Sequence, residues 1–310
     1  MNDILYVIEN SEYVKINYSK IDETLKKIPK NGEYIHWSST IRDFELLSEK
    51  EKIIFAIMYE SINFCFWDNY SWNIIYNGKA WNGSMAMLYS MAKALENGKI
   101  ELNTEFLSKL SEKEFSSALN INECKLSMIR ERYNSFKQTF DTIYNKKNKF
   151  WQELYSIKTA EKMEEYISKE FTSFHDVSNY KGKKIIFNKR NRLLIRDLYY
   201  ISKTVNDNIR NIDNIKGCAD YNLPRYFRDE GIFIYAESLM RIIDEEIEIT
   251  SGSNIEVELR ANTIYVIELI KEKLKKVGKK TNSLELDGIL WNLSKIQQKT
   301  LPHHTRSIYY

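Results

Sequence analysis

The sequence predicts an all-α protein, and three observations lead to this fold class. Glycine and proline are scarce, with 10 and 3 copies in 310 residues, far below their usual combined share of about 12%. Apolar residues recur at helical spacing in most of the chain, whereas stretches with strand-like alternation are short. With 43% apolar residues, the chain can also bury a substantial core. Sandwiches, barrels and glycine-loop nucleotide folds are therefore disfavoured.

The first strong helical signal is a capping box, Ser48-Glu-Lys-Glu51, in which the serine and glutamate side chains each accept a backbone N–H at the start of the helix. Apolar residues follow at three-to-four spacing over residues 53–62, and this stripe continues into Asn63-Phe-Cys-Phe-Trp67. A second helix is expected over residues 84–95. It should end at Asn97-Gly98, because glycine readily adopts the left-handed conformation that closes a helix.

Helical periodicity recurs through the rest of the chain, and we expect helices over residues 122–144, 159–171, 189–202, 236–246, 256–277 and 284–296. Residues 183–187 are too few to indicate more than a local strand. No repeat, low-complexity tract or proline-rich linker interrupts the sequence. We therefore expect a single domain over residues 1–310, built as one unit or as two closely packed helical lobes.

Charge and cysteine usage narrow the classes of partner and compartment. The 46 basic and 43 acidic residues give a net charge of +3, which argues against the strong positive field of a protein that binds nucleic acid. Cys65, Cys124 and Cys218 are odd in number and far apart, unlike a disulfide framework or a zinc site. The N-terminus lacks a leader pattern, and no apolar run approaches the roughly 20 residues of a membrane span. We expect a cytoplasmic protein without a membrane partner.

A metal site has weak support. Glu33-Tyr-Ile-His36 is the one Glu-x-x-His motif, and His175, His303 and His304 lack ligand spacing. Cys65 lies in a predicted apolar helix, where a thiol usually packs inertly. We therefore expect neither a metal nor another cofactor.

The segment 174–235 combines charged and aromatic residues and contains the candidate catalytic pair. Lys189 precedes Asp220 by 31 positions, and Asp220 lies in Cys218-Ala-Asp-Tyr-Asn-Leu-Pro224. A carboxylate in a turn between Gly217 and Pro224 could be partly desolvated and kept ionised by the ammonium group, as electrostatic catalysis requires. The alternative is a structural Asp220 that caps a helix beginning near Pro224, with Lys189 exposed to solvent.

Two further motifs have both a structural and a functional interpretation. The aromatic residues of Asn63-Phe-Cys-Phe-Trp67 fit either a core stripe or a wall on which a planar heterocycle stacks. Glu256 and Arg260 are four residues apart on a predicted helix. We interpret them as a supporting ion pair.

Six motifs occur in order along most of the chain: Asn63-Phe-Cys-Phe-Trp67, Trp81-Asn-Gly83, Phe187-Asn-Lys-Arg190, Ala219-Asp-Tyr221, Glu256-Val-Glu-Leu-Arg-Ala261 and Thr305-Arg-Ser-Ile-Tyr-Tyr310. Together they resemble the queuosine salvage proteins, also described as queuosine 5'-phosphate N-glycosylases. The family usually has serine where this chain has Cys65. The resemblance implies an all-α fold similar to helix-hairpin-helix DNA glycosylases.

The resemblance also implies a hydrolase activity, namely cleavage of the N-glycosidic bond of queuosine 5'-monophosphate to release queuine and ribose 5-phosphate for queuine salvage into tRNA. It attaches importance to Lys189 and Asp220. Asp220 would stabilise positive charge on the sugar and activate water. Lys189 would orient Asp220 or move a proton toward the base. Because carbon replaces N7 in this base, hydrogen-bond donors must absorb its negative charge elsewhere.

The implied substrate contacts are less sharply defined. They are Phe64, Trp67 and Tyr221 for the base, Asp197 for the secondary ammonium of the substrate, and Arg190 and Arg306 for the 5'-phosphate. The family often has arginine and glutamine where this chain has Asn222 and Arg225, so contacts there are open. A glycosylase acting on a nucleic acid and a non-catalytic binder of the nucleoside are the alternatives. Oligomeric state and the preference among nucleoside, 3'-phosphate and 5'-phosphate are also open.

Overall fold

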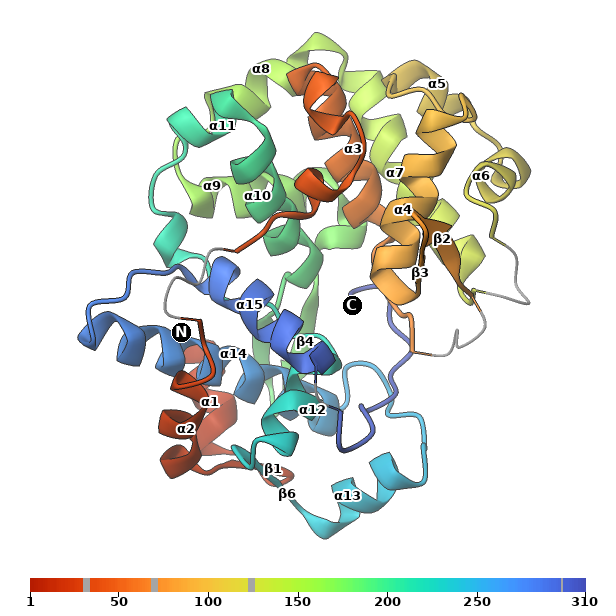
Figure 1. Cartoon of the computed structure of the whole chain (residues 1–310). Helices are drawn as coiled ribbons and strands as arrows, with labels where there is room; N and C mark the ends of the chain where they lie inside the picture. The colour runs from red at the N-terminus through yellow and green to blue at the C-terminus, as the bar shows by residue number, and fades with distance from the viewer. Residues whose placement is uncertain (30–33, 68–71, 122–125, 297) are drawn as a thin grey trace.

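The computed structural model describes residues 1–29, 34–67, 72–121, 126–296 and 298–310, and helices dominate it (Figure 1). The first part contains α1 (Asn2–Glu9), β1 (Val14–Ile16), α2 (Ile21–Leu25), α3 (Glu49–Ile62), β2 (Ile74–Tyr76), β3 (Lys79–Trp81) and α4 (Gly83–Glu96). The middle part contains α5 (Thr104–Lys109), α6 (Glu112–Ala118), α7 (Ile129–Lys146), α8 (Asn148–Ser156), α9 (Ala160–Glu170), β4 (Val177–Tyr180), β5 (Lys183–Ile186), α10 (Lys189–Ile201) and α11 (Lys203–Asn208). The last part contains α12 (Asn222–Asp229), β6 (Phe233–Tyr235), α13 (Glu237–Asp244), α14 (Asn254–Lys276) and α15 (Ser283–Ile296).

The expected helical character is confirmed, with one addition. The short strands form antiparallel pairs, β1 with β6, β2 with β3, and β4 with β5. The strand expected at residues 183–187 is β5, which pairs Lys183 with Tyr180 across a tight turn. These pairs are too small to change the fold class, and they link helical segments at the surface of the core.

Local capping signals in the sequence mark several helix starts correctly. The Ser48 side chain accepts the Glu51 N–H while the Glu51 side chain accepts the Ser48 N–H, so the capping box opens α3 as predicted. Thr159 caps α9 by accepting the Lys162 N–H. Gly98, at φ +65°, follows the end of α4. The start expected at Asn122 lies outside the described residues, and α7 itself begins at Ile129.

The end of α3 corrects the prediction that its apolar stripe is helical through Trp67. The helix stops at Ile62, and Cys65, at φ +47°, is buried in an irregular segment. Two buried arginines explain this end, because their guanidinium groups take backbone carbonyls of the last turn. Arg132 donates to Ile62 O at 2.6 Å and to Cys65 O at 2.7 Å, and Arg190 donates to Ser61 O at 2.6 Å.

The described core has a large cluster, mostly from residues 37–218, and a second cluster drawn from both ends of the chain, residues 14–28 and 223–290. A smaller third cluster packs α1 against α14 and the hairpin of β4 and β5. Figure 1 shows α3, α4 and α7–α11 on one side and α1, α2 and α12–α14 on the other. Helix α15 joins them, since Leu284 packs in the first cluster and Leu290 in the second. The single-domain interpretation of residues 1–310 stays a prediction.

Helix α10 places charged side chains deep in the molecule. Residues 189–198 are all buried, although four of them are basic and one is acidic. Helix α10 packs on α3 and also approaches α15. Charged groups at this depth need partners or a cavity. In the described part of the chain, no helix combines the length and apolar character that crossing a bilayer requires.

Candidate functional site

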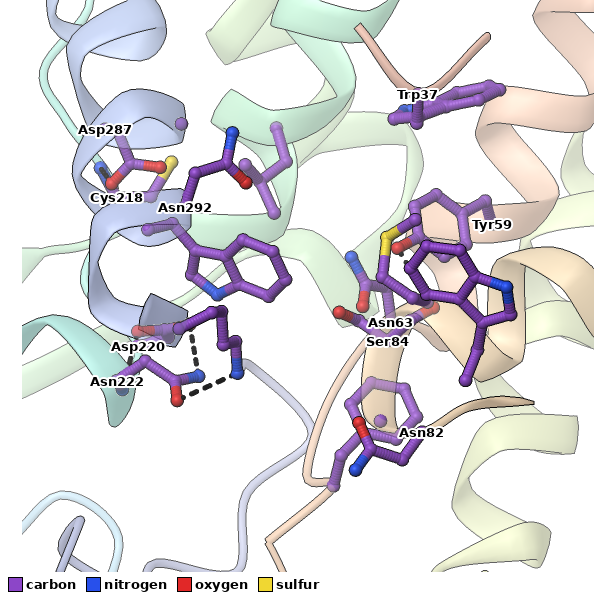
Figure 2. A pocket seen from close by; sticks show the side chains of 18 of the residues that line it. Trp37, Tyr59, Asn63, Asn82, Ser84, Cys218, Asp220, Asn222, Asp287 and Asn292 are labelled. Carbon is purple, nitrogen blue, oxygen red and sulfur yellow. Dashed lines mark hydrogen bonds between the residues drawn. The ribbon is translucent and has the colours of Figure 1, made fainter. Parts of the chain in front are cut away.

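A cavity of about 680 Å³ lies between two walls of the molecule. Figure 2 shows one wall with Cys218, Asp220 and Asn222 beside Asp287 and Asn292 of α15, facing a second wall with Trp37, Tyr59, Asn63, Asn82 and Ser84. The first wall comes from the loop before α12 and from α15. The second comes from the end of α3, the start of α4 and the 3-10 turn that contains Trp37. Cavities of this size suit a nucleotide-sized ligand.

Asp220 lies in this cavity and also caps α12. Its Oδ1 accepts the backbone N–H groups of Asn222 at 2.8 Å and Leu223 at 3.1 Å, and its Oδ2 accepts the Asn222 side-chain amide at 3.3 Å. The structural alternative is therefore supported in part: Tyr221 is the N-cap residue of α12, but Asp220, one position earlier, satisfies the first two N–H groups of the helix. This role does not exclude a function, because the same bonds orient the carboxylate. These hydrogen bonds fix the orientation of the Asp220 side chain, which lines the cavity.

Lys189 is buried, which corrects the alternative in which it is solvated. It is 8% exposed and occupies the first turn of α10, where its backbone N–H donates to Asp176 Oδ2 at 3.3 Å. Its side chain lines the same cavity as Asp220. Within the described residues, no carboxylate lies within 4.0 Å of the Lys189 ammonium group. The predicted pair thus shares a cavity without a direct ion pair.

Two buried carboxyl groups in the cavity were missed at the sequence level. Glu60 on α3 is fully buried, and burial together with the nearby charge of Asp197 raises its pKa to about 8. Asp287 on α15 is 6% exposed, and burial together with the charge of Asp220 raises its pKa to about 7. The charge of Lys189 opposes both shifts. The available signal was an acidic residue inside an apolar helical stripe.

Asn222, one of the two positions that depart from the family pattern, belongs to the site. Its Oδ1 accepts the Lys295 ammonium at 3.1 Å, so Lys295, Asn222 and Asp220 form the chain of hydrogen bonds drawn in Figure 2. Arg225, the other departure, pairs with Asp229 at 3.0 Å and donates to Ser294 O. Arg225 is therefore placed where it fastens α12 to α15 rather than at the described lining of the cavity.

The predicted aromatic contacts divide into two groups. Phe64 and Tyr221 line the cavity, as do Trp81 and Trp291, which the sequence analysis did not identify as contacts. Trp67 lies elsewhere among the described residues, because its indole stacks on the His304 ring at 4.3 Å and donates to Thr305 O at 2.9 Å. Trp67 thus fastens the C-terminal segment.

Asp197, predicted to meet the substrate's ammonium group, is fully buried behind the described cavity lining. Its Oδ1 lies 3.1 Å from His36 Nε2 and 3.3 Å from the Arg196 guanidinium group. Burial raises the pKa of Asp197, but the His36 hydrogen bond and the Arg196 charge outweigh it and leave the pKa below its usual value. Asp197 affects the cavity indirectly, because its negative charge raises the pKa of Glu60, which lines the cavity.

The two arginines predicted to bind phosphate also have other partners. Arg190 donates to the carbonyls of Glu60, Ser61 and Ser173, and burial lowers its pKa to about 9. Arg306 is 3.7 Å from Glu248 and lies over the Trp67 ring. Neither belongs to the described lining of the cavity, where Lys79 and Lys295 are the more exposed cations.

Metal ligands and reactive thiols are also placed by the structure. No group of three or more histidine, cysteine or acidic side chains able to hold a metal occurs in the described ranges. Glu33 and Cys124 lie outside the described residues, and His36 bonds Asp197 and Ser38. Cys65 and Cys218 are buried thiols, and burial raises the pKa of Cys218 well above its usual value. Thiolate chemistry at Cys218 is thereby disfavoured.

Comparison with known sequences finds consistent matches. The family described as "Queuosine salvage protein" matches residues 45–310. A protein of Sphaerobacter thermophilus named "Queuosine 5'-phosphate N-glycosylase/hydrolase" is 26% identical over 98% of this chain and 95% of its own length. Proteins of the same name from Bos taurus (26% identical, 85% of this chain and 83% of its own length) and Dictyostelium discoideum (24%, 96% and 94%) also match.

Proposed function

The chain belongs to the queuosine salvage protein family, and from this premise we propose that it hydrolyses the N-glycosidic bond of queuosine 5'-monophosphate. The products are queuine and ribose 5-phosphate. One observation carries the proposal: Asp220 and Lys189, 31 positions apart in the sequence, line one nucleotide-sized cavity together with aromatic side chains. The relatives named for this activity match across nearly the whole chain.

Asp220 acts on the sugar in this proposal. Cleavage of the bond builds positive charge on the ribose ring, and a carboxylate fixed beside it stabilises that charge without having to reorganise. The two backbone N–H groups that Asp220 accepts provide this fixation. The same carboxylate takes a proton from the water that attacks C1'. The chain of hydrogen bonds from Lys295 through Asn222 supports its orientation.

Lys189 acts as a fixed positive charge in the cavity. Its charge opposes the upward pKa shifts of Glu60 and Asp287 and so favours the ionised form of each carboxyl group. Phe64, Tyr221 and Trp81 supply aromatic surface for the base. For the 5'-phosphate we favour Lys79 and Lys295, because Arg190 and Arg306 have partners elsewhere.

The test is a substrate panel. Purified protein is incubated separately with queuosine, its 3'-phosphate and its 5'-phosphate, and free queuine is measured by mass spectrometry. We expect turnover of the 5'-phosphate above the other two. Binding without product would favour a non-catalytic binder. Salt-sensitive binding and cleavage of an oligonucleotide would favour a nucleic-acid glycosylase.

Asp220→Asn is the matched catalytic variant. Asparagine can still cap α12, so we expect the fold to persist, while queuine release falls by about 10³-fold or more. Asp141→Asn serves as the control, because Asp141 forms a surface pair with Lys137 on α7. An Asp220→Asn variant as active as Asp141→Asn would remove Asp220 from the mechanism.

Three further parts of the proposal concern the fold relationship, the form of the substrate and the cellular compartment. The predominantly helical fold is compatible with a relation to helix-hairpin-helix DNA glycosylases. The near-neutral charge balance supports a free nucleotide rather than a nucleic acid as substrate. We also place the enzyme in the cytoplasm, and localisation of a tagged full chain in its native cell tests this assignment.

A further inference from the structure

Asp287 is a buried carboxyl group in the cavity to which the mechanism above gives no task. It is 6% exposed and lies on α15, in the wall that also holds Asp220 (Figure 2). Its Oδ1 accepts the backbone N–H of Cys218 at 3.2 Å. Its Oδ2 makes no hydrogen bond with any described residue. A carboxyl group with one bonded oxygen, at the edge of a cavity, is suited to act on a ligand.

Asp287 and Asp220 are structurally tied to each other. Cys218, which donates to Asp287, lies two residues before Asp220 in the same loop. Helix α12, which Asp220 caps, packs directly on α15. Asp220 and Asp287 therefore line the same cavity from two linked segments.

The two carboxyl groups have opposite hydrogen-bonding environments. Asp220 accepts three hydrogen bonds, an arrangement in which it serves as an acceptor. Asp287 accepts one and has five titratable or charged groups among its neighbours. These are Lys189 and Arg196 from α10, Cys218 and Asp220 from the loop before α12, and Tyr34.

The balance of these neighbours keeps a substantial fraction of Asp287 protonated near neutral pH. Burial and the charge of Asp220 raise its pKa, the charges of Arg196 and Lys189 and the Cys218 amide lower it, and the result is a pKa of about 7. Two carboxyl groups in different environments are the kind of pair that glycosidic cleavage uses as acid and base.

We propose that Asp287 is the general acid of the reaction, donating its proton to the departing 7-deazaguanine base. This inference rests on the proposed function. As the bond between C1' and the base nitrogen breaks, its electron pair goes to the base, and the Asp287 proton lets the base leave neutral. The oxygen of water bonds to C1', and one of its protons passes to Asp220. Transfer of that proton to Asp287 through cavity water restores the starting state, so one water is consumed.

The decisive experiment compares two leaving groups. Asp287→Asn keeps an oxygen to accept the Cys218 N–H and removes the transferable proton. It is assayed on queuosine 5'-monophosphate and on the 5-phosphate of 4-nitrophenyl β-D-ribofuranoside, whose leaving group departs without protonation. We expect kcat to fall by about 10²–10⁴-fold on the nucleotide and by less than about tenfold on the nitrophenyl substrate. Equal losses on both substrates would overturn the assignment.

Asp220→Asn is the comparison variant in this experiment. Because Asp220 acts on the sugar and the water, its loss should slow both substrates alike. A protein that leaves queuosine 5'-monophosphate intact in its wild-type form refutes the proposed function. An active wild type whose Asp287→Asn variant loses both activities equally refutes only the role of Asp287.

A pH profile gives a second test of the assignment. Hydrolysis of the nucleotide should slow above pH about 7, as Asp287 loses its proton, whereas the nitrophenyl substrate should lack this alkaline decline. Glu60→Gln is the control for the other carboxyl group with a raised pKa. If Glu60→Gln abolishes the decline and Asp287→Asn retains it, the acid is Glu60 and the proposal fails.

Discussion

Two buried groups of charges in this molecule differ in how fully their members are partnered. We call Asp176, Glu256 and Arg260 the anchor cluster and Glu60, Lys189, Asp220 and Asp287 the cavity cluster. In the anchor cluster, Arg260 contacts both oxygens of Asp176 and lies 3.2 Å from Glu256. Its guanidinium group also lies over the Phe187 and Tyr310 rings. The ion pair expected between Glu256 and Arg260 is thereby confirmed.

The cavity cluster is less deeply buried, because Asp220 is only partly buried. Among the described residues, none of its members forms an ion pair within 4.0 Å. Burial raises the pKa of carboxyl groups in both clusters, Glu256 in the anchor cluster and Glu60 and Asp287 in the cavity cluster. The two clusters meet where Asp176 accepts the backbone N–H of Lys189. Both regions therefore contain buried charged groups. The candidate site differs in that its charged groups have no ion-pair partner among the described residues and can interact with a ligand instead.

The strongest test of this contrast breaks the anchor cluster. Arg260→Met should lower the free energy of unfolding by about 3–5 kcal/mol, because it leaves two buried carboxylates without their cation. Denaturant unfolding measures the loss, and kcat per folded molecule should stay within about threefold of wild type at low temperature. A variant with normal stability would show that the anchor cluster has no stabilising role.

The matching change in the cavity cluster is Lys189→Met. Since Lys189 has no direct ion-pair partner among the described residues, we expect a change of less than about 1 kcal/mol in stability. In the proposed mechanism its charge acts at the reacting groups, so kcat should fall by about 10²–10³-fold, equivalent to about 3–4 kcal/mol. If Lys189→Met lowers the free energy of unfolding as much as Arg260→Met does, the proposed difference between the two clusters is wrong.

The smallest expected effect is a pH dependence of stability caused by Glu60. Its pKa is about 8 in the folded protein and 4.5 ordinarily, so the unfolded chain releases this proton first as the pH rises. Wild type should therefore lose stability relative to Glu60→Gln as the pH rises from about 6 to about 7.5, by on the order of 2 kcal/mol. Parallel unfolding curves for the two proteins across this range would contradict the raised pKa.

The sequence predicted helices well where their signals are local. Ser48 and Thr159 cap α3 and α9 as expected because a cap involves residues three positions apart. The end of α3 was missed because Arg132 and Arg190, which take its carbonyls, come some 70 and 130 residues later. Such ends are set by tertiary contacts that no local pattern contains.

Prediction of the site was likewise limited to what local sequence motifs contain, because tertiary contacts decide which charged residues face the cavity. Lys189 and Asp220 were identified by family motifs, and the structure brings them to one cavity. Asp197 and Arg190 have the right charge but face other partners, which residue type alone cannot reveal. Asp287 was overlooked because the face of a helix that an acidic side chain occupies depends on its neighbours. Tertiary packing decides which charged side chains have partners, and residue type does not indicate it.

The cavity is assembled from segments spread between residue 34 and residue 310. Strand β1 pairs with β6 more than two hundred positions away, so the two ends of the chain also depend on each other. No short fragment holds enough of the lining to bind a ligand. Recovery of catalysis during refolding would therefore report the last docking events of the polypeptide, and helical signal, which forms locally, should return earlier than turnover.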